Sequence, residues 1–159
     1  MAIQAYPPVS FFFKVEINGF EGEAGFQSVD GLSVTIDEDK HEEGGENTFT
    51  HRFPKRVTYG DLTLKRGTLI GSDLISWFND AVQNFEFSPK DVTVTLMNAE
   101  QEPLDQWVFR NAWPKTWTIE SFDAKSGTVS METIVMAYQY FVRSGLPARA
   151  QSLKKFPTP

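Results

Sequence analysis

The chain has 159 residues, the usual length of one domain, and with 40% hydrophobic and 23% charged residues it has an ordinary globular composition. It contains no cysteine, which excludes a thiol nucleophile, an iron–sulfur cluster and any disulfide. Its formal charge of −6 argues against a general nucleic-acid binder, because phosphate contacts need clustered Lys and Arg.

The first third of the chain is predicted to be β-structure. Residues 11–17 alternate between apolar and polar side chains, which predicts a strand with one buried face. Phe12 is the exception, an apolar side chain on the exposed face. A short extended segment at 26–29 and a second alternating strand at 32–36 follow, separated by the turn signal Asp30-Gly31.

Residues 37–46 form the most polar segment, with six acids in ten residues and no apolar side chain. We expect an exposed loop or an extended hairpin arm here. His41 lies within this segment and His51 follows it, so a divalent metal could in principle find imidazole and carboxylate ligands. The spacing matches no known ligand pattern, and a solvated loop without metal is the preferred interpretation.

The middle of the chain contains two further strands and a helix. Alternation resumes at 47–53, is expected to stop at Pro54, and returns at 61–66. At 73–84 the apolar residues recur at i, i+3, i+4, i+7 and i+8, which places them on one face of a helix. Ser72 or Asp73 is the expected N-cap, since a short side-chain oxygen can accept from the first free N–H groups.

The remaining elements are again predicted strands. They cover 91–98, 104–112 and 115–122, with Pro114 expected to interrupt the last two, and a long final strand at 128–142 that is apolar on both faces in its second half.

The N-terminal residues are not expected to be a secretory signal. Residues 1–8 lack the basic and apolar regions of a secretory signal, and no stretch approaches the ~20 apolar residues of a membrane span. We therefore expect a protein made in the cytoplasm without a stable membrane anchor. Residues 143–159, with Lys154, Lys155 and three prolines, are expected to be extended.

Motifs for catalysis are weak. Gly19, Gly22 and Gly25 lie in an acidic turn without the lysine and hydroxyl of a phosphate loop, and no nucleophile elbow occurs. We therefore expect no enzyme, no cofactor and no metal. The aromatic residues, 14% of the chain, point instead to interaction surfaces, because aromatic side chains are enriched where subunits meet. A dense core or a carbohydrate-binding platform of Trp107, Trp113 or Trp117 stays open as an alternative.

Several strings of residues together resemble the inner tube proteins of contractile phage tails, and most of all the tube subunits of phage-tail-like extracellular contractile injection systems. Their order and spacing agree from about residue 6 to residue 142. The strings are Tyr6-Pro-Pro-Val-Ser-Phe-Phe-Phe-Lys-Val15, Phe26-Gln-Ser-Val-Asp-Gly-Leu32, Glu43-Gly-Gly-Glu-Asn47, Leu62-Thr-Leu-Lys-Arg-Gly67, Asn111-Ala-Trp-Pro114 and Ala137-Tyr-Gln-Tyr-Phe141.

The resemblance implies a mainly β fold of two packed antiparallel sheets, sandwich-like or barrel-like, with one flanking helix. It implies a tube domain at 1–143 and a C-terminal extension at 144–159, past the usual end of the pattern. That extension leaves open a main tube protein or a tube initiator beside the baseplate. Neither catalysis nor a cofactor is implied.

In that family the subunits form homohexameric rings that stack into a tube around a lumen, inside a contractile sheath. The implied partners are further copies of the chain, the sheath protein, baseplate and tube-terminating proteins, and cargo in the lumen, with no specific nucleic-acid sequence. The particle would assemble in a bacterial cytoplasm and can be released from the cell. Phage, tailocin and extracellular injection system all stay open, as does the cargo.

Specific residues are predicted to carry these contacts. The acidic arm is the expected contact between stacked rings, with Lys65 and Arg66 as charge partners for the acids of the next ring. The lumen wall is expected to be polar or acidic, which would keep anionic cargo from sticking. The predicted arm residues are Glu42, Glu43, Gly44, Gly45, Glu46 and Asn47, and the predicted subunit interface consists of Tyr6, Pro7, Pro8, Phe12, Lys65, Arg66, Trp113, Tyr138 and Tyr140.

Overall fold

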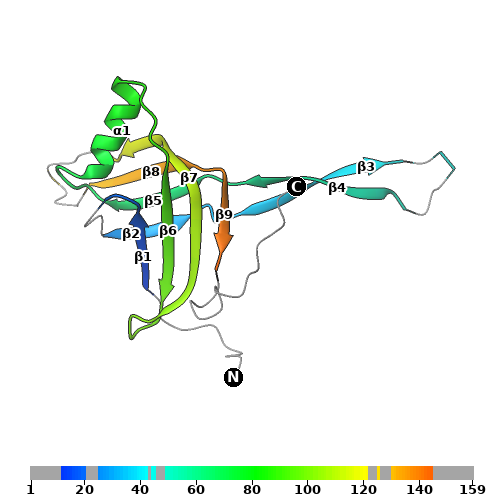
Figure 1. Ribbon diagram of the computed structural model, residues 1–159, viewed down its shortest axis with the longest axis horizontal. Coiled ribbons are helices and arrows are strands. Elements are labelled where there is room, and N and C mark those ends of the chain that lie inside the picture. Colours follow the sequence, from blue (N-terminus) through cyan, green and yellow to red (C-terminus); the bar gives the residue numbers. More distant parts are fainter. Residues whose placement is uncertain are drawn as a thin grey trace.

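The computed structural model describes residues 12–20, 25–42, 44–45, 49–121, 125 and 130–144. Within these residues the chain forms nine strands and one helix (Figure 1). They are β1 (Phe12–Ile17), β2 (Phe26–Asp30), β3 (Val34–His41), β4 (His51–Tyr59), β5 (Leu62–Gly67), α1 (Asp73–Gln83), β6 (Lys90–Met97), β7 (Pro103–Ile119), β8 (Met131–Ala137) and β9 (Tyr140–Arg143).

The body of the molecule is a folded-over antiparallel sheet with the strand order β1-β6-β7-β8-β5-β2, and β9 pairs with β7 beside this path. Strand β7 belongs to both layers: its first half pairs with β6 and β9, and its second half pairs with β8. The predicted mainly β architecture with one helix is thereby confirmed. Within the described residues, β1, β2 and β9 each pair on one side alone and are the edge strands of this sheet.

The bend in β7 lies at Asn111, whose φ of 52° places it in the left-handed region that asparagine tolerates better than most residues. The Asn111 backbone N–H donates to Asp91 Oδ1 at 3.1 Å, and its side-chain amide donates to Gln139 Oε1 at 2.8 Å. Pro114, expected to interrupt this strand, instead lies inside it. A register shift between Pro114 and Thr116 accommodates the proline, because a bulge tolerates the missing donor.

The alternating pattern of the sequence builds the core as predicted. Alternate residues of β1, β5, β6 and β8 point into the space between the layers, so each strand buries one face. The buried apolar cluster consists of Val15, Ile17, Leu62, Leu64, Leu74, Trp77, Val92, Val94, Phe109, Ala112, Ile134 and Met136.

Helix α1 covers one end of the sandwich, and its apolar face was predicted correctly. Leu74, Trp77 and Ala81 are buried, and the Trp77 indole N–H donates to the Ser88 carbonyl at 2.9 Å. Ser72 is the N-cap by position, but its side chain makes no capping hydrogen bond. Its hydroxyl accepts from Arg66 Nη2 at 2.7 Å instead, so the helix start is tied to the sheet.

A buried ion pair joins two neighbouring strands. Arg66 on β5 and Glu132 on β8 are direct cross-strand partners, their side chains form a salt bridge, and both residues are 0% exposed. The Trp117 indole N–H on β7 donates to the second carboxylate oxygen at 3.2 Å. The Arg66 guanidinium also lies 5.3 Å from the ring centre of Phe26 on β2. This pair therefore connects β2, β5, β7, β8 and the start of α1.

The long strand expected at 128–142 is two strands. The chain leaves the layer of β8 after Ala137, and the Gln139 N–H donates to the Arg110 carbonyl as β9 begins beside β7. The residues 138–139 therefore carry the chain from one layer to the other. This crossover explains why apolar residues occur on both faces in the sequence: successive parts of the segment pack in different layers.

Strands β3 and β4 form a separate two-stranded ribbon that projects from the sandwich (Figure 1). This arm is longer than the predicted loop, because β4 runs through Pro54 rather than stopping there. The register shift between Ile36 and Glu38 lies opposite this proline, and a two-stranded ribbon leaves the other edge free of any ladder partner. At its base, the ring of Tyr59 packs 5.4 Å from that of Phe141.

Replacing Glu132 with alanine tests the buried ion pair. The substitution leaves the Arg66 charge buried without its carboxylate, so we expect the free energy of unfolding to fall by about 3–5 kcal/mol. Urea unfolding monitored by circular dichroism measures this change. The control is Glu120→Ala at an exposed position, expected within about 0.5 kcal/mol of the parent chain. Equal effects of the two substitutions would contradict the role given to the pair.

Candidate assembly surfaces

The predicted arm residues lie at the far end of the β3–β4 hairpin. Glu42, Gly44 and Gly45 are exposed there, and Gly45 has a φ of 111°, which only glycine adopts readily. Glu43, Glu46 and Asn47 lie outside the described residues, as do Tyr6, Pro7 and Pro8 from the predicted interface. The hairpin prediction for 37–46 is therefore confirmed for the strand part of the segment.

The base of the arm carries an apolar face, formed by residues of the strand predicted at 32–36 and by its partner strand β4. Val34, Ile36 and Val57 lie on the same side of the ribbon, since Ile36 pairs with Val57 and Val34 with Tyr59. All three are exposed, Ile36 to 64%. The alternation correctly predicted a strand, but the apolar side of that strand meets no layer of its own chain within the described residues.

Three rings form a ladder near the tip of the arm. The ring of His51 lies 4.9 Å from that of Phe49 and 6.2 Å from that of Phe53, and both phenylalanines are more than half exposed. His41 pairs with His51 across the hairpin. In the part of the chain that the structure describes, these residues and the nearby carboxylates do not form a group of three metal-binding side chains.

The two neighbouring cations of β5 differ in their exposure to solvent. Lys65 is exposed, as a charge partner for another subunit must be. Arg66 is fully buried and paired with Glu132, so its assignment as a charge partner for the next ring is wrong. The alternation that buries Leu62 and Leu64 continues to Arg66, and this signal in the sequence could have revealed the buried cation.

The predicted aromatic interface residues are spread over several surfaces. Phe12 lies on the edge strand β1 and is 56% exposed, and Tyr140 on β9 is also exposed. Trp113 is partly exposed on β7. Tyr138 is different, because its ring packs 4.8 Å from the core residue Phe109.

Two exposed phenylalanines that were not predicted as interface residues, Phe85 and Phe87, lie beside Trp113. Phe87 makes edge-to-face contacts with Phe85 at 5.0 Å and with Trp113 at 5.9 Å. Phe85 is 82% exposed and has a φ of 54°, a conformation that is strained for a bulky residue. We call this cluster the aromatic patch; it consists of Phe85, Phe87 and Trp113. Two phenylalanines in the short connection between α1 and β6 were the signal that could have found it.

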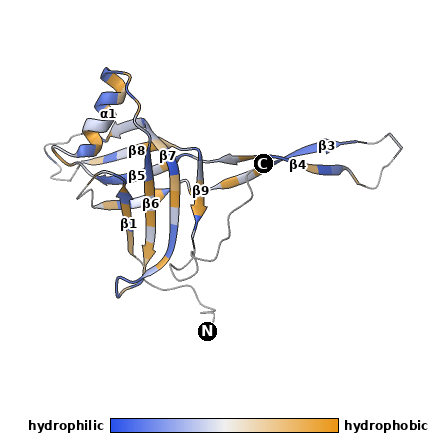
Figure 2. Cartoon of the chain, in the orientation of Figure 1, coloured by the Kyte–Doolittle hydropathy of each residue, from blue (hydrophilic) through white to orange (hydrophobic). Residues whose placement is uncertain are grey.

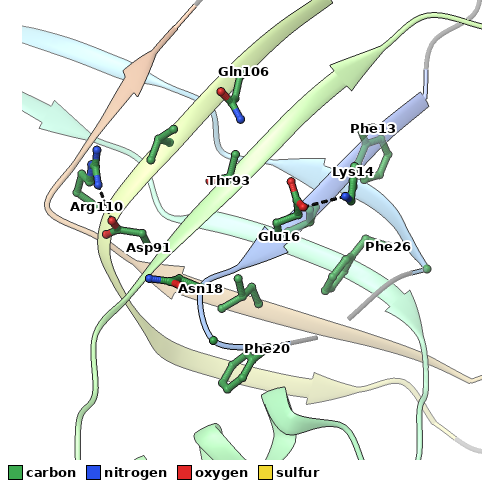
Figure 3. Close-up of a pocket in the computed structure, with 15 residues that line it drawn as sticks. Phe13, Lys14, Glu16, Asn18, Phe20, Phe26, Asp91, Thr93, Gln106 and Arg110 are labelled. Atoms are coloured by element: carbon green, nitrogen blue, oxygen red, sulfur yellow. Dashed lines mark hydrogen bonds and ion pairs between the residues drawn. The ribbon is translucent and has the colours of Figure 1, made fainter. Parts of the chain in front are cut away.

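A groove of about 760 Å³ runs along the edge strand β1 (Figure 3). Its charged side chains come from β1, β6 and β7 and form two ion pairs: Lys14 Nζ lies 2.8 Å from Glu16 Oε1, and Arg110 Nη1 lies 2.5 Å from Asp91 Oδ2. Hydrogen bonds from the Asn111 backbone and from Arg110 lower the pKa of Asp91. The groove thus offers charge-balanced pairs rather than a reactive acid, base or nucleophile.

The hydroxyl of Tyr138 is buried, and among the described residues it has no hydrogen-bond partner. Burial raises its pKa from 10.0 to about 12, and the negative charge of nearby Asp61 adds to this shift. A buried hydroxyl in such a place acts as a core side chain. The role of Tyr138 at a subunit interface stays a prediction.

Within the described residues the only helix has eleven residues, which is too short to cross a membrane. The surfaces available for contacts with other proteins are the projecting hairpin, the open sheet edge and the exposed aromatic side chains of the β-sandwich.

Sequence comparison assigns the family. A family model described as T4-like virus tail tube protein gp19 matches residues 9–142, and the chain belongs to this family. No curated protein sequence matches it.

Solved structures agree with this assignment. A chain of the anti-feeding prophage (AFP) baseplate is 28% identical, with a TM-score of 0.78, and the match covers 92% of this chain and 99% of that one. A chain of the PVC extracellular contractile injection system, from its sheath–tube complex in the extended state, is 27% identical with a TM-score of 0.77 and coverage of 90% and 95%. Hcp1 from Salmonella typhimurium, 13% identical with a TM-score of 0.55 and coverage of 87% and 88%, shares the fold.

The Tyr138 hydroxyl predicts how stability depends on alkaline pH. Its pKa is about 12 in the folded chain and 10.0 for an unperturbed tyrosine, so its contribution is fully present below pH 10 and is lost as pH rises from 10 to 12. Tyr138→Phe should therefore flatten the fall in stability across this window, measured by urea unfolding at several pH values. Tyr140→Phe, at an exposed tyrosine, serves as the control. An unchanged fall in the Tyr138→Phe variant would contradict this assignment.

Proposed function

We propose that this chain is a structural subunit of the inner tube of a contractile injection system or phage tail. The observation that carries the proposal, beyond family membership, is the projecting arm with its uncovered apolar face. A two-stranded ribbon is marginally stable alone in water, and exposed apolar side chains of this kind are typical of surfaces that meet another protein. Membership of a family of tail tube proteins also supports a structural role without catalysis or a cofactor.

The proposed assembly is a ring of six copies, stacked on further rings around a lumen. The AFP baseplate structure is described as 6-fold symmetrised, which supports this number. The open edge of β1, with Phe12, and the aromatic patch are suitable contacts between copies in a ring, because joining sheets between subunits removes exposed edges. Tyr140 and the N-terminal Tyr6, Pro7 and Pro8 are proposed to lie at the same contacts.

Contacts between rings are assigned to the tip of the arm. Its acids, Glu42, Glu43 and Glu46, are proposed to meet Lys65 of a copy in the next ring, with Gly44, Gly45 and Asn47 forming the turn. Each exposed charge pair contributes little alone, about 0–1 kcal/mol. Repetition around the ring and along the tube gives these small contributions their total effect.

The proposed partners follow the printed names of the similar structures, which include a sheath–tube complex and a baseplate. We propose that this chain meets a sheath protein outside the tube, baseplate and tube-terminating proteins at its ends, and cargo in the lumen. Residues 1–143 are proposed as the tube domain and 144–159 as an extension. The particle would assemble in a bacterial cytoplasm, and its release from the cell is part of the proposal for an extracellular system.

A tube initiator at the baseplate end is the alternative within the same machine, supported by the similarity to a baseplate chain. The alternative from another class, a carbohydrate-binding module, is less compatible with the aromatic geometry. Sugar rings stack on flat exposed faces, whereas Phe87 and Trp113 meet at 84°. The Trp117 N–H is bonded to buried Glu132, and Arg143 lies 5.6 Å from the Trp107 ring centre.

Negative-stain electron microscopy of the purified full chain tests the proposed function. Six-fold rings, or tubes built from them, are the expected result. A chain that stays monomeric at high concentration in sedimentation velocity, and shows no rings, would contradict the proposal.

Reversing the charge of the arm tip tests the stacking contact. Changing Glu42, Glu43 and Glu46 to lysine should leave rings intact but shorten or abolish tubes, because the tip would then repel Lys65 of the next ring. The measurement is tube length by negative-stain microscopy, with circular dichroism to establish folding. Adding Lys65→Glu should restore part of the tube length. Long tubes from the lysine variant would show that the arm tip is not the stacking contact.

Substituting the aromatic patch tests a contact within the ring. Phe85→Gly and Phe87→Ser should weaken ring formation at least about ten-fold in concentration, since each removes exposed apolar area available to a neighbour. Glycine at position 85 also relieves the positive φ, so the unassembled chain should unfold no more easily than the parent. Sedimentation velocity and urea unfolding give the two readouts. Val82→Ser, at an exposed position on α1, is the matched control, and equal assembly of all variants would contradict the contact.

A further inference from the structure

The two strands of the arm carry opposite charges. Strand β3 (Val34–His41) contains the consecutive acids Asp37, Glu38 and Asp39 and one lysine. Strand β4 (His51–Tyr59) contains three cations, Arg52, Lys55 and Arg56, and no acid. The outer half of β3 is correspondingly hydrophilic along its whole length (Figure 2). Each edge of this ribbon therefore has its own sign of charge.

Contacts inside the hairpin use only part of this charge. Glu38 Oε1 forms ion pairs with Arg52 Nη2 at 2.8 Å and with Lys40 Nζ at 3.6 Å. The Thr58 hydroxyl donates a hydrogen bond to Asp37 Oδ2 at 3.0 Å. Asp39, Lys55 and Arg56 belong to no ion pair among residues 12–20, 25–42, 44–45, 49–121, 125 and 130–144. Charges of both signs are thus left over for an external partner.

The register places these charges at the same height on the ribbon. Ile36 pairs with Val57 and Asp39 pairs with Phe53, so Asp37 to Asp39 lie opposite the segment that contains Lys55 and Arg56. Two arms set side by side without a shift would bring the acids of one beside the cations of the other. Opposite charges facing each other across adjacent strands stabilise the pairing, and like charges oppose it.

Topology allows this contact to form a regular sheet. Both strands of the arm are edges of a two-stranded sheet, so each has unpaired backbone groups on its outer side. Hairpins that point in the same direction around a ring alternate β3, β4, β3, β4. Every junction between neighbours is then antiparallel, like the pairing within each hairpin.

We propose that the β3 edge of one copy pairs with the β4 edge of its neighbour in the same ring, through Asp37 and Asp39 on one side and Lys55 and Arg56 on the other. The inference rests on the proposed function and names a surface and an occupant, a second copy of this chain. Two β3 edges repel, and so do two β4 edges, which opposes a two-fold dimer of arms. The contact is heterologous, the type that closes into rings.

Two charge-reversed chains test this pairing. The first carries Asp37→Lys and Asp39→Lys, so both of its edges are basic, and the second carries Lys55→Asp and Arg56→Asp, so both of its edges are acidic. Each alone should need roughly ten-fold more protein than the parent to assemble, because every junction is repulsive. An equimolar mixture should assemble like the parent, since alternating copies make every junction attractive and a ring of six admits strict alternation.

The measurement is sedimentation velocity with negative-stain microscopy, at ~0.1 M and ~1 M salt, because screening weakens contacts between exposed charges. The matched control for the first variant, Glu100→Lys with Glu120→Lys, raises the net charge by the same amount outside the arm and should assemble like the parent. Recovery in the mixture separates repulsion between copies from damage inside a hairpin, which mixing cannot repair. Two results would overturn the pairing: normal assembly of each charge-reversed chain by itself, or a mixture of the two folded chains that stays unassembled. If the parent chain still forms rings, the proposed function stands in either case. A parent chain without rings would overturn both.

Discussion

The ion pair between Arg66 and Glu132 holds the sandwich in its observed arrangement. Removing two charges from water is costly, and the cost is offset here by direct pairing and by further hydrogen bonds to the same two groups. Ser72 accepts from the guanidinium, Trp117 donates to the carboxylate, and the ring of Phe26 lies against the cation. A shift of β5 against β8 by one residue would separate the two charges, so the pair also fixes the register of the layer.

A body fixed in this way leaves other surfaces free for contacts with neighbours. The cross-layer core accounts for the buried aromatic and aliphatic side chains, but the apolar face at the base of the arm and the aromatic patch have no cover within the described residues. The arm lies away from the core and gains little from its own chain beyond the contacts of Tyr59 at its base. The structure thus separates into a self-sufficient sandwich and a hairpin that is suited to completion by another copy.

Much of this fold could be predicted from the alternation of apolar residues. The period of two located β1, β5 and β6, and the helical period located α1 to within a residue at its end. Proline was the main source of error, because Pro54 and Pro114 are poor strand residues locally but are tolerated at an edge and at a bulge. Those positions depend on strand order, which no local pattern reveals.

The site was harder to predict than the fold, for a physical reason. The alternation of β5 places Arg66 on the buried face, but its partner Glu132 is sixty-six positions away, so the local pattern does not show what neutralises the charge. Likewise, Val34 and Ile36 have the alternation of core residues, yet the ribbon that contains them leaves the sandwich. Resemblance to a family supplied the class of protein, whereas the distribution of charge between β3 and β4 became meaningful only when the register was known.

Hydrogen–deuterium exchange of the parent chain, compared between its dilute and its assembled form, tests most directly the claim that the arm is completed by other copies. The amides of β5 and β8 should be protected in both forms, because the buried ion pair and the core hold them without a partner. The amides of β3 and β4 should exchange fast in the dilute chain and become protected on assembly. An arm that exchanges equally fast in both forms would contradict the account.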